Sequence, residues 1–232
     1  FNMLPWWQWP KEFKIKNNKF LKSWIKERSE KILIKKLIQW HLDRQWKSVK
    51  DFAKSYNVKL IGDLPFYVSR DSADVWSNKS LFSIFKNGAL IFQSGVPPDY
   101  FSSTGQLWGT PTYFWSKHKK TNFDWWRKRF KRQFELVDLL RLDHFRGLAG
   151  YWRVSGNSKT AICGKWINSP GRRLLNKLKN DLRTDYLPII AEDLGVITPD
   201  VEKLRKNFEL PGMKILQFAF DGNKNNPYLP KN

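Results

Sequence analysis

The first part of the chain carries apolar residues at helical spacing. Residues 11–30 form a lysine-rich segment after Trp9-Pro10, and residues 31–56 carry a stronger pattern. In the second segment the apolar positions follow steps of three and four, the period of one helix face, at Ile34, Ile38, Leu42, Trp46, Val49 and Ala53. The pattern therefore predicts two helices before the first strand.

Apolar runs and amphipathic segments alternate along most of the remaining chain. Four runs are typical of strands, at 58–68, 139–143, 187–195 and 213–220. Within the first run we expect the strand to end at Gly62-Asp63. Three amphipathic segments predict helices, at 123–138, 171–182 and 198–208, the last with Thr198 as N-cap and Pro199 at its first position. Near-continuous apolar strands joined by helices indicate a parallel sheet, so we expect an α/β fold.

Residues 77–121 interrupt this alternation with a long irregular section. We expect a hairpin at "NGALIFQSG" and a loop at "VPPDYFSSTGQLWGTP". A loop of that length in a compact domain is usually functional or disordered, and its aromatic residues argue against disorder. The sequence contains no internal repeat and no low-complexity linker, which favours a single domain.

Composition supports a folded protein with a strongly basic surface. Of the 232 residues 41% are hydrophobic and 16% aromatic, and the 13 tryptophans suit sugar rings as well as cores. The formal net charge of +21 comes from lysines scattered between apolar positions, which is typical of a solvated face. We therefore favour a compositional bias over a nucleic-acid partner, although the charge leaves that alternative open.

The single cysteine and the lack of long apolar runs indicate where in the cell the protein is located. Cys163 cannot form an internal disulfide, which favours a reducing, cytoplasmic location. No apolar run approaches the ~20 residues of a membrane span, so we expect no membrane association. The chain begins with Phe1 rather than methionine, and we expect it to be an internal piece of a longer protein.

Charged residues gather at the ends of the predicted strands. In "LLRLDHFRG", strand alternation places Leu139, Arg141 and Asp143 on one face, either as a structural ion pair or as functional groups. Asp63 and Glu192 follow two other apolar runs in the same way. Parallel strands that end in carboxylates at one edge are typical of a (β/α) barrel active site, whereas the alternative is that each acid caps the following helix.

Two carboxyl groups flanking one bond are the usual means of cleaving a glycosidic linkage. One must be ionised, and Arg141 on the same strand face favours the ionised form of Asp143. The other must keep its proton in a drier or more negative setting, which Glu192 can fill. A metal site would compete for such acids, but of the three histidines His41 and His118 are expected at the surface. His144 either contacts a substrate hydroxyl or satisfies a core partner, and we expect no metal and no cofactor.

Several long blocks, "IGDLPFYVSRDSADVW", "GVPPDYFSSTGQLWGTPTY", "RLDHFRGLAGYW" and "AEDLGVITPDVEKLRKNFELPGMKILQFAF", resemble the 4-alpha-glucanotransferases. These enzymes, also called amylomaltases or disproportionating enzymes, are family 77 of the glycoside hydrolases. The resemblance runs from about Trp9 to near the C-terminus and implies a (β/α)8 TIM barrel of the alpha-amylase type. It also implies retaining transfer of a 1,4-alpha-glucan segment to a glucose or maltooligosaccharide acceptor.

The same resemblance implies roles for individual residues. Asp143 matches the nucleophile, Glu192 the general acid/base, and Arg141 and Asp63 match cleft residues near the cleaved bond. A retaining mechanism predicts about 5–5.5 Å between the Asp143 and Glu192 carboxyl groups. In the loop block four positions match the segment over the glucan cleft, where they either bind glucose rings or pin the loop: Tyr100, Phe101, Gln106 and Trp108. Thr110 stands where the family usually has asparagine.

Other departures concern the extent of the barrel. The family's third catalytic aspartate, in an HDN-type block, has no counterpart here, and the family's opening strands are absent before Phe1. We therefore expect residues 1–232 to be one domain, the middle part of a barrel with a glucan-binding insertion at about 77–121, inactive and poorly soluble alone. The alternatives are a hydrolase of short alpha-glucans and a non-catalytic glucan-binding protein.

Overall fold

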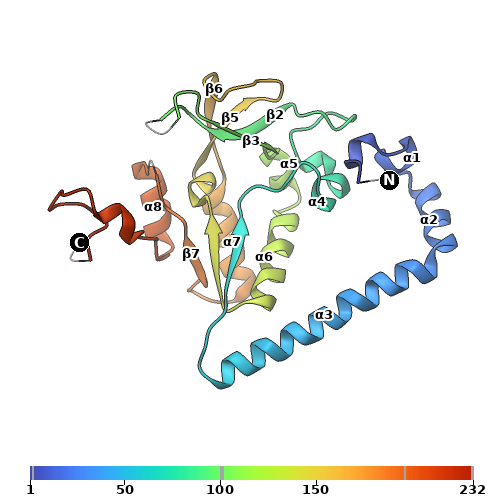
Figure 1. Ribbon diagram of the computed structural model, residues 1–232, viewed down its shortest axis with the longest axis horizontal. Helices are drawn as coiled ribbons and strands as arrows, with labels where there is room; N and C mark the ends of the chain where they lie inside the picture. Colours follow the sequence, from blue (N-terminus) through green and yellow to red (C-terminus); the bar gives the residue numbers. More distant parts are fainter. Residues whose placement is uncertain (2, 100–101, 196, 231–232) are drawn as a thin grey trace.

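The computed structural model describes residues 1, 3–99, 102–195 and 197–230. At its centre lies a three-stranded parallel sheet in the order β1-β4-β7, formed by β1 (Ile61–Pro65), β4 (Leu139–Asp143) and β7 (Ile189–Ala191) (Figure 1). In the register of the sheet, Asp63 lies opposite Arg141, and Pro65 lies opposite Asp143. The predicted α/β class with parallel strands is confirmed.

Helices cover one face of this sheet because one face of each strand is apolar. Leu64, Leu140, Leu142, Ile189 and Ala191 are buried there. They join a single core with buried side chains of three helices, which are α6 (Asp124–Leu136), α7 (Gly171–Leu182) and α8 (Pro199–Asn207). These three helices match the predicted segments. The opposite sheet face carries the charged residues of β1 and β4.

A second sheet lies beyond the carboxyl ends of the parallel strands (Figure 1). Its antiparallel order is β3-β2-β5-β6, formed by β2 (Phe92–Val96), β3 (Gln106–Pro111), β5 (Gly150–Ser155) and β6 (Gly164–Asn168). The expected loop at 96–111 is therefore wrong over β3. Each of these strands has only five or six residues and contains a glycine. Among them only β2 overlaps a predicted pairing segment, the hairpin at "NGALIFQSG", and β2 pairs with β3 and β5.

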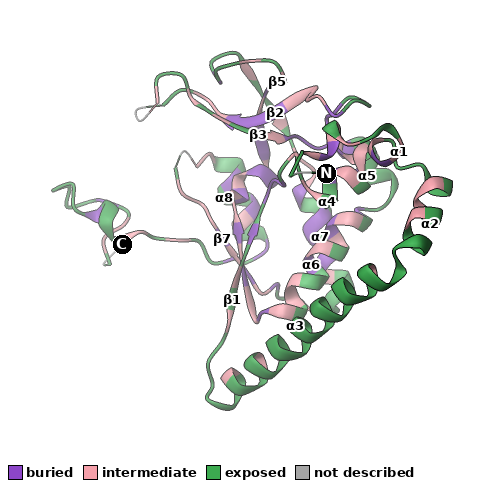
Figure 2. Cartoon of the chain, turned by 45° about the vertical axis from the view of Figure 1, so that its right-hand side comes forward, coloured by how far each residue is buried: buried purple, intermediate pink, exposed green. Residues whose placement is uncertain are grey.

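The predicted helix over 11–30 is three elements in the structure: α1 (Lys11–Lys14), α2 (Asn18–Glu27) and the beginning of α3 (Ser29–Ser55). Lys16 has a φ of 59°, which breaks the helix, and the Asn17 side chain accepts a hydrogen bond from the Phe20 N–H and caps α2. Helix α3 confirms the second predicted helix. Its apolar face is exposed, with Ile34 at 50% and Leu42 at 55% (Figure 2).

Two short helices, α4 (Ala73–Ser77) and α5 (Trp115–Lys120), flank a buried aromatic cluster that includes Phe66, Tyr113 and Trp126. His118 of α5 lies in this cluster and is 0% exposed, so its expected surface position is wrong. The lysines around it occupy the exposed side of α5, whereas His118 faces the rings. Burial lowers the pKa of His118 to about 4.

The predicted strand at 213–220 is also wrong. The segment ends in a 3-10 helix at Leu216–Ala219, and Phe220 is 79% exposed. An apolar run becomes a strand only where another strand pairs with it. In the described part of the chain, β7 makes one backbone bond in this direction, from the Ala191 N–H to the Pro211 carbonyl (2.8 Å), and Pro211 lies before the run at 213–220.

None of the helices in the described residues combines the length and apolar character needed to cross a membrane.

Candidate active site

Three charged side chains form one ion-paired group on the open face of the parallel sheet. The Arg141 guanidinium donates to both Asp63 carboxylate oxygens at 3.0 and 2.7 Å, and to Asp143 Oδ1 at 3.2 Å. β4 produces this arrangement because alternate residues share a face, while Leu140 and Leu142 are buried on the other side. Asp63 lies inside β1, two residues before the strand ends, so its expected position at the strand end is wrong.

Glu192 lies directly after β7 and is fixed by backbone groups. Its Oε2 accepts from the His144 N–H at 2.8 Å, and its Oε1 accepts from the Leu194 N–H at 3.2 Å. Burial raises the pKa of Glu192, the negative charge of Asp143 adds to the increase, and the two N–H donors oppose it. The carboxyl group expected to keep its proton therefore lies in a setting that favours the protonated form.

The turn after β4 brings these groups together. His144 has a φ of 53°, in the left-handed region, and this conformation directs its N–H to Glu192. Gly147 follows in a 3-10 helix, where a Cβ atom would lie 2.6 Å from the Phe66 ring, so only glycine fits. The His144 Nε2 is buried and has no hydrogen-bond partner among the described residues. Burial, with a smaller effect from Arg146, lowers the pKa of His144 to about 4, so the ring is neutral near pH 7.

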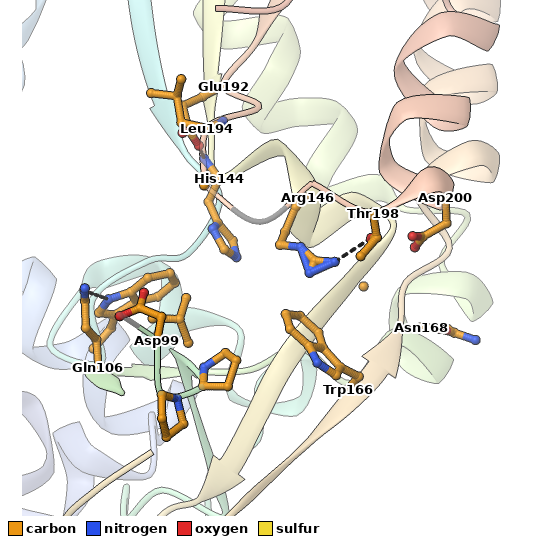
Figure 3. A pocket seen from close by; sticks show the side chains of 16 residues that line it. Asp99, Gln106, His144, Arg146, Trp166, Asn168, Glu192, Leu194, Thr198 and Asp200 are labelled. Carbon is orange, nitrogen blue, oxygen red and sulfur yellow. Dashed lines mark hydrogen bonds between the residues drawn. The ribbon is translucent and has the colours of Figure 1, made fainter. Parts of the chain in front are cut away.

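A cavity of about 620 Å³ opens in front of Glu192, between the carboxyl end of the parallel sheet and the second sheet (Figure 3). Four of the residues that the sequence suggested for the site line it: Gln106, Trp108, His144 and Glu192. Asp63, Arg141 and Asp143 do not line it and lie on the adjoining face of the parallel sheet. Tyr100 and Phe101 lie outside the described residues.

A bulge in β3 places Trp108 in the cavity. Gln93 pairs with Pro111 and Gly95 pairs with Leu107, so the single residue Ser94 faces the three residues Trp108, Gly109 and Thr110. Gly109 has a φ of 65°, and the Thr110 hydroxyl is hydrogen-bonded to the buried Ser94 hydroxyl. Bulges of this kind re-aim side chains beside active sites. Thr110, which stands where the family usually has asparagine, therefore stabilises the bulge through its hydroxyl group.

The sequence reasoning missed the residues at the other side of the cavity. Arg146 donates to the Thr198 hydroxyl at 2.9 Å, and its guanidinium lies 4.0 Å from the centre of the Trp166 ring. Asp99 and Asp200 also line the cavity. Arg146 stands in the same block as Asp143, so its charge was a signal. Trp166 lies in a segment without helical or strand periodicity, and no sequence signal marked it.

The arrangement combines a carboxylate held by a guanidinium with a half-buried carboxyl group of raised pKa, at the ends of neighbouring strands. Such a pair can supply a nucleophile and a general acid. The neutral His144 ring and the exposed Trp108 ring, 4.9 Å apart and perpendicular, form an edge of the cavity that can contact a sugar.

Comparison with known proteins gives one consistent result. The family model for 4-alpha-glucanotransferase matches residues 1–232. The 4-alpha-glucanotransferase of Clostridium butyricum is 45% identical over 233 residues, covering 100% of this chain and 47% of that protein. The enzyme of Synechocystis sp. is 47% identical over 228 residues, covering 98% of this chain and 45% of that protein.

A solved structure agrees with the sequence matches. The amylomaltase of Streptococcus agalactiae, in complex with acarbose, superimposes with a TM-score of 0.94 at 37% identity, covering 100% of this chain and 47% of that chain. The three-stranded parallel sheet and its helices thus correspond to part of an amylomaltase fold, and the chain spans about half the length of the relatives it matches. With a family model matched from its first residue to its last, the chain belongs to the 4-alpha-glucanotransferase family, glycoside hydrolase family 77.

Proposed function

We propose that the protein transfers segments of 1,4-alpha-glucans to glucose or maltooligosaccharide acceptors by a retaining double displacement. One observation carries this proposal. Asp143, held by Arg141, and Glu192, whose pKa is raised by burial, lie at the ends of neighbouring strands beside a cavity of about 620 Å³. Family membership supports the same reaction.

In the first step Asp143 attacks the anomeric carbon of the donor glucan, and Glu192 gives its proton to the departing glycosidic oxygen. The bond between the two sugars breaks, and a glycosyl ester forms on Asp143. Arg141 orients Asp143 through a hydrogen bond, while Asp63 fixes Arg141 through its two hydrogen bonds.

In the second step the Glu192 carboxylate removes a proton from the acceptor's 4-hydroxyl group, whose oxygen attacks the anomeric carbon of the glycosyl ester. Asp143 leaves as a carboxylate, and the glycosidic bond is restored with its original configuration. Trp108 and Gln106 of β3, with Tyr100 and Phe101 of the same sequence block, hold sugar rings and exclude water, which favours a sugar acceptor over hydrolysis.

We extend the proposal to the setting of the protein. Its partners are maltooligosaccharides or other alpha-1,4-glucans, and its location is the cytoplasm, in keeping with a single cysteine. Residues 1–232 form one part of a catalytic barrel domain in which the segment at about 77–121 covers the glucan cleft. The activity belongs to the product of the complete reading frame.

The test is product analysis after incubation of that product with maltotriose, beside its Asp143→Asn variant. A ladder of longer maltooligosaccharides plus glucose, absent in the variant, is the expected result. Glucose and maltose without longer products would indicate a hydrolase. No reaction from a folded wild type would contradict the proposal and leave a glucan-binding role.

A further inference from the structure

The cavity has two ends that differ in their relation to Glu192. At one end the Trp108 ring lies 4.9 Å from the His144 ring, and the His144 N–H donates to Glu192. The other end, which we call the distal end, is formed by Arg146, Trp166, Asn168, Thr198 and Asp200. Figure 3 shows the distal end across the open space from Gln106 and Asp99. One continuous cavity therefore connects Trp108, whose ring contacts the residue that binds Glu192, with a second tryptophan at the distal end.

The Trp166 ring is held in place without being covered. It is 45% exposed, although the Trp152 ring lies 5.4 Å from it and the Arg146 guanidinium lies 4.0 Å above its centre. A large aromatic ring that is fixed by neighbours and still open to a cavity is typical of a ligand contact rather than of core packing.

The contact with Trp166 leaves two buried donor groups of Arg146 without hydrogen-bond partners among the described residues. The Arg146 Nη2 group donates to the Thr198 hydroxyl, while its Nε and Nη1 groups are buried and have no hydrogen-bond partner among the described residues. Unpaired buried donors cost stability. Thr198 also departs from its usual role, because it is the N-cap of α8 and its hydroxyl does not cap the helix. The Arg146 and Thr198 side chains thus hold the Trp166 ring in place at a cost in the free energy of folding.

We propose that the distal end binds a glucose unit of the glucan that lies remote from the bond being cleaved. The apolar face of a pyranose suits the exposed part of the Trp166 ring, and its hydroxyl groups suit the amide of Asn168 and the carboxylate of Asp200, which line the same end. Trp166 is then a residue that determines specificity for chain length, and Arg146 is the positioning residue that orients its ring. The inference rests on the proposed function.

Donor length selectivity tests this assignment. The ratio of kcat/KM for maltoheptaose to kcat/KM for maltotriose is measured for the product of the complete reading frame and for its Trp166→Ala variant. We expect the ratio to fall roughly tenfold in the variant, the effect of losing about 55 Å² of apolar contact with the longer glucan. The change should lie mainly in KM, and Trp166→Phe should restore part of the ratio.

Trp40→Ala provides a matched control. Trp40 is 51% exposed and carries the Arg44 guanidinium 4.7 Å from its ring, but it lies on α3 and not in the cavity. The control should keep the wild-type ratio. Calorimetric binding of maltoheptaose and maltotriose in a Glu192→Gln background gives the same comparison without turnover.

The outcomes separate the inference from the proposed function. An unchanged ratio in Trp166→Ala, with an active wild type, would overturn the distal sugar site and leave the transferase proposal intact. An equal fall in Trp40→Ala would also overturn it. Absence of transfer by the folded wild type from either glucan would overturn the proposed function, and the calorimetric comparison would then decide the inference alone.

Discussion

The hydrogen bond between Ser94 and Thr110 should determine both the stability of the β3 bulge and the placement of Trp108. The substitution Thr110→Val keeps the shape of the side chain and removes its hydroxyl. Ser94 is 0% exposed, so its hydroxyl would lose its partner in a place that water does not reach. An unsatisfied buried hydroxyl costs roughly 1–3 kcal/mol in the free energy of unfolding. For a chain of this size each kcal/mol corresponds to about 2–4 °C in Tm.

A double-mutant cycle isolates this interaction. Urea unfolding is measured for Thr110→Val, for Ser94→Ala and for the pair. We expect the double variant to be more stable than the sum of the single losses implies, because the second substitution removes the unpaired group. Thr110→Ser keeps the hydroxyl and serves as the control. In Thr110→Val the KM for maltotriose should also rise, because Trp108 loses its position in the cavity. Losses that add within about 0.5 kcal/mol would refute the reasoning.

Three further predictions follow from burial and charge. Because the pKa of Glu192 is raised in the folded protein, its ionised form destabilises the fold, and Glu192→Gln should raise Tm at pH 7. The increase should shrink as the pH falls from the raised folded pKa toward the unfolded value of about 4.3 and be nearly absent below it; an increase that is equal at pH 4 and pH 7 would contradict the assignment. Because burial lowers the pKa of His118 to about 4, the folded protein should lose stability as the pH falls from about 6.5 toward 4, and His118→Asn should lose less over that range in thermal melts. Leu142 is 0% exposed on the helix-covered face of β4, so Leu142→Ala should lower the free energy of unfolding by about 2–5 kcal/mol in urea titrations, and a loss below about 1 kcal/mol would contradict its place in the core.

The parallel sheet and its helices were predictable because their patterns are local and strong. Helix α7 was predicted with its observed ends, Gly171 and Leu182, and β4 was predicted with the face shared by Arg141 and Asp143. The position of Asp63 was misjudged because Gly62 and Pro65 suggested an early end to the strand, whereas β1 continues to Pro65.

The second sheet and half of the cavity were not predictable in the same way. Its strands are stabilised by pairing between segments far apart in the sequence, such as β2 with β5, and glycine-rich strands carry little pattern of their own. Trp166 enters the cavity only through that pairing. His118 was misplaced because neighbouring lysines hid a contact with aromatic rings distant in sequence. The run at 213–220 has strand composition but no strand to pair with in the described part of the chain.

The central claim is that Asp143 is the nucleophile and Glu192 the general acid/base, and trapping of the covalent intermediate tests it most directly. α-Maltosyl fluoride carries a leaving group that needs no proton, so a Glu192→Gln variant of the complete reading-frame product should still be glycosylated. It should then release the sugar slowly, because the base for the second step is absent. Mass spectrometry should find one maltosyl unit on the peptide that contains Asp143. A maltosyl unit on another residue, or none while fluoride is released, would contradict the account.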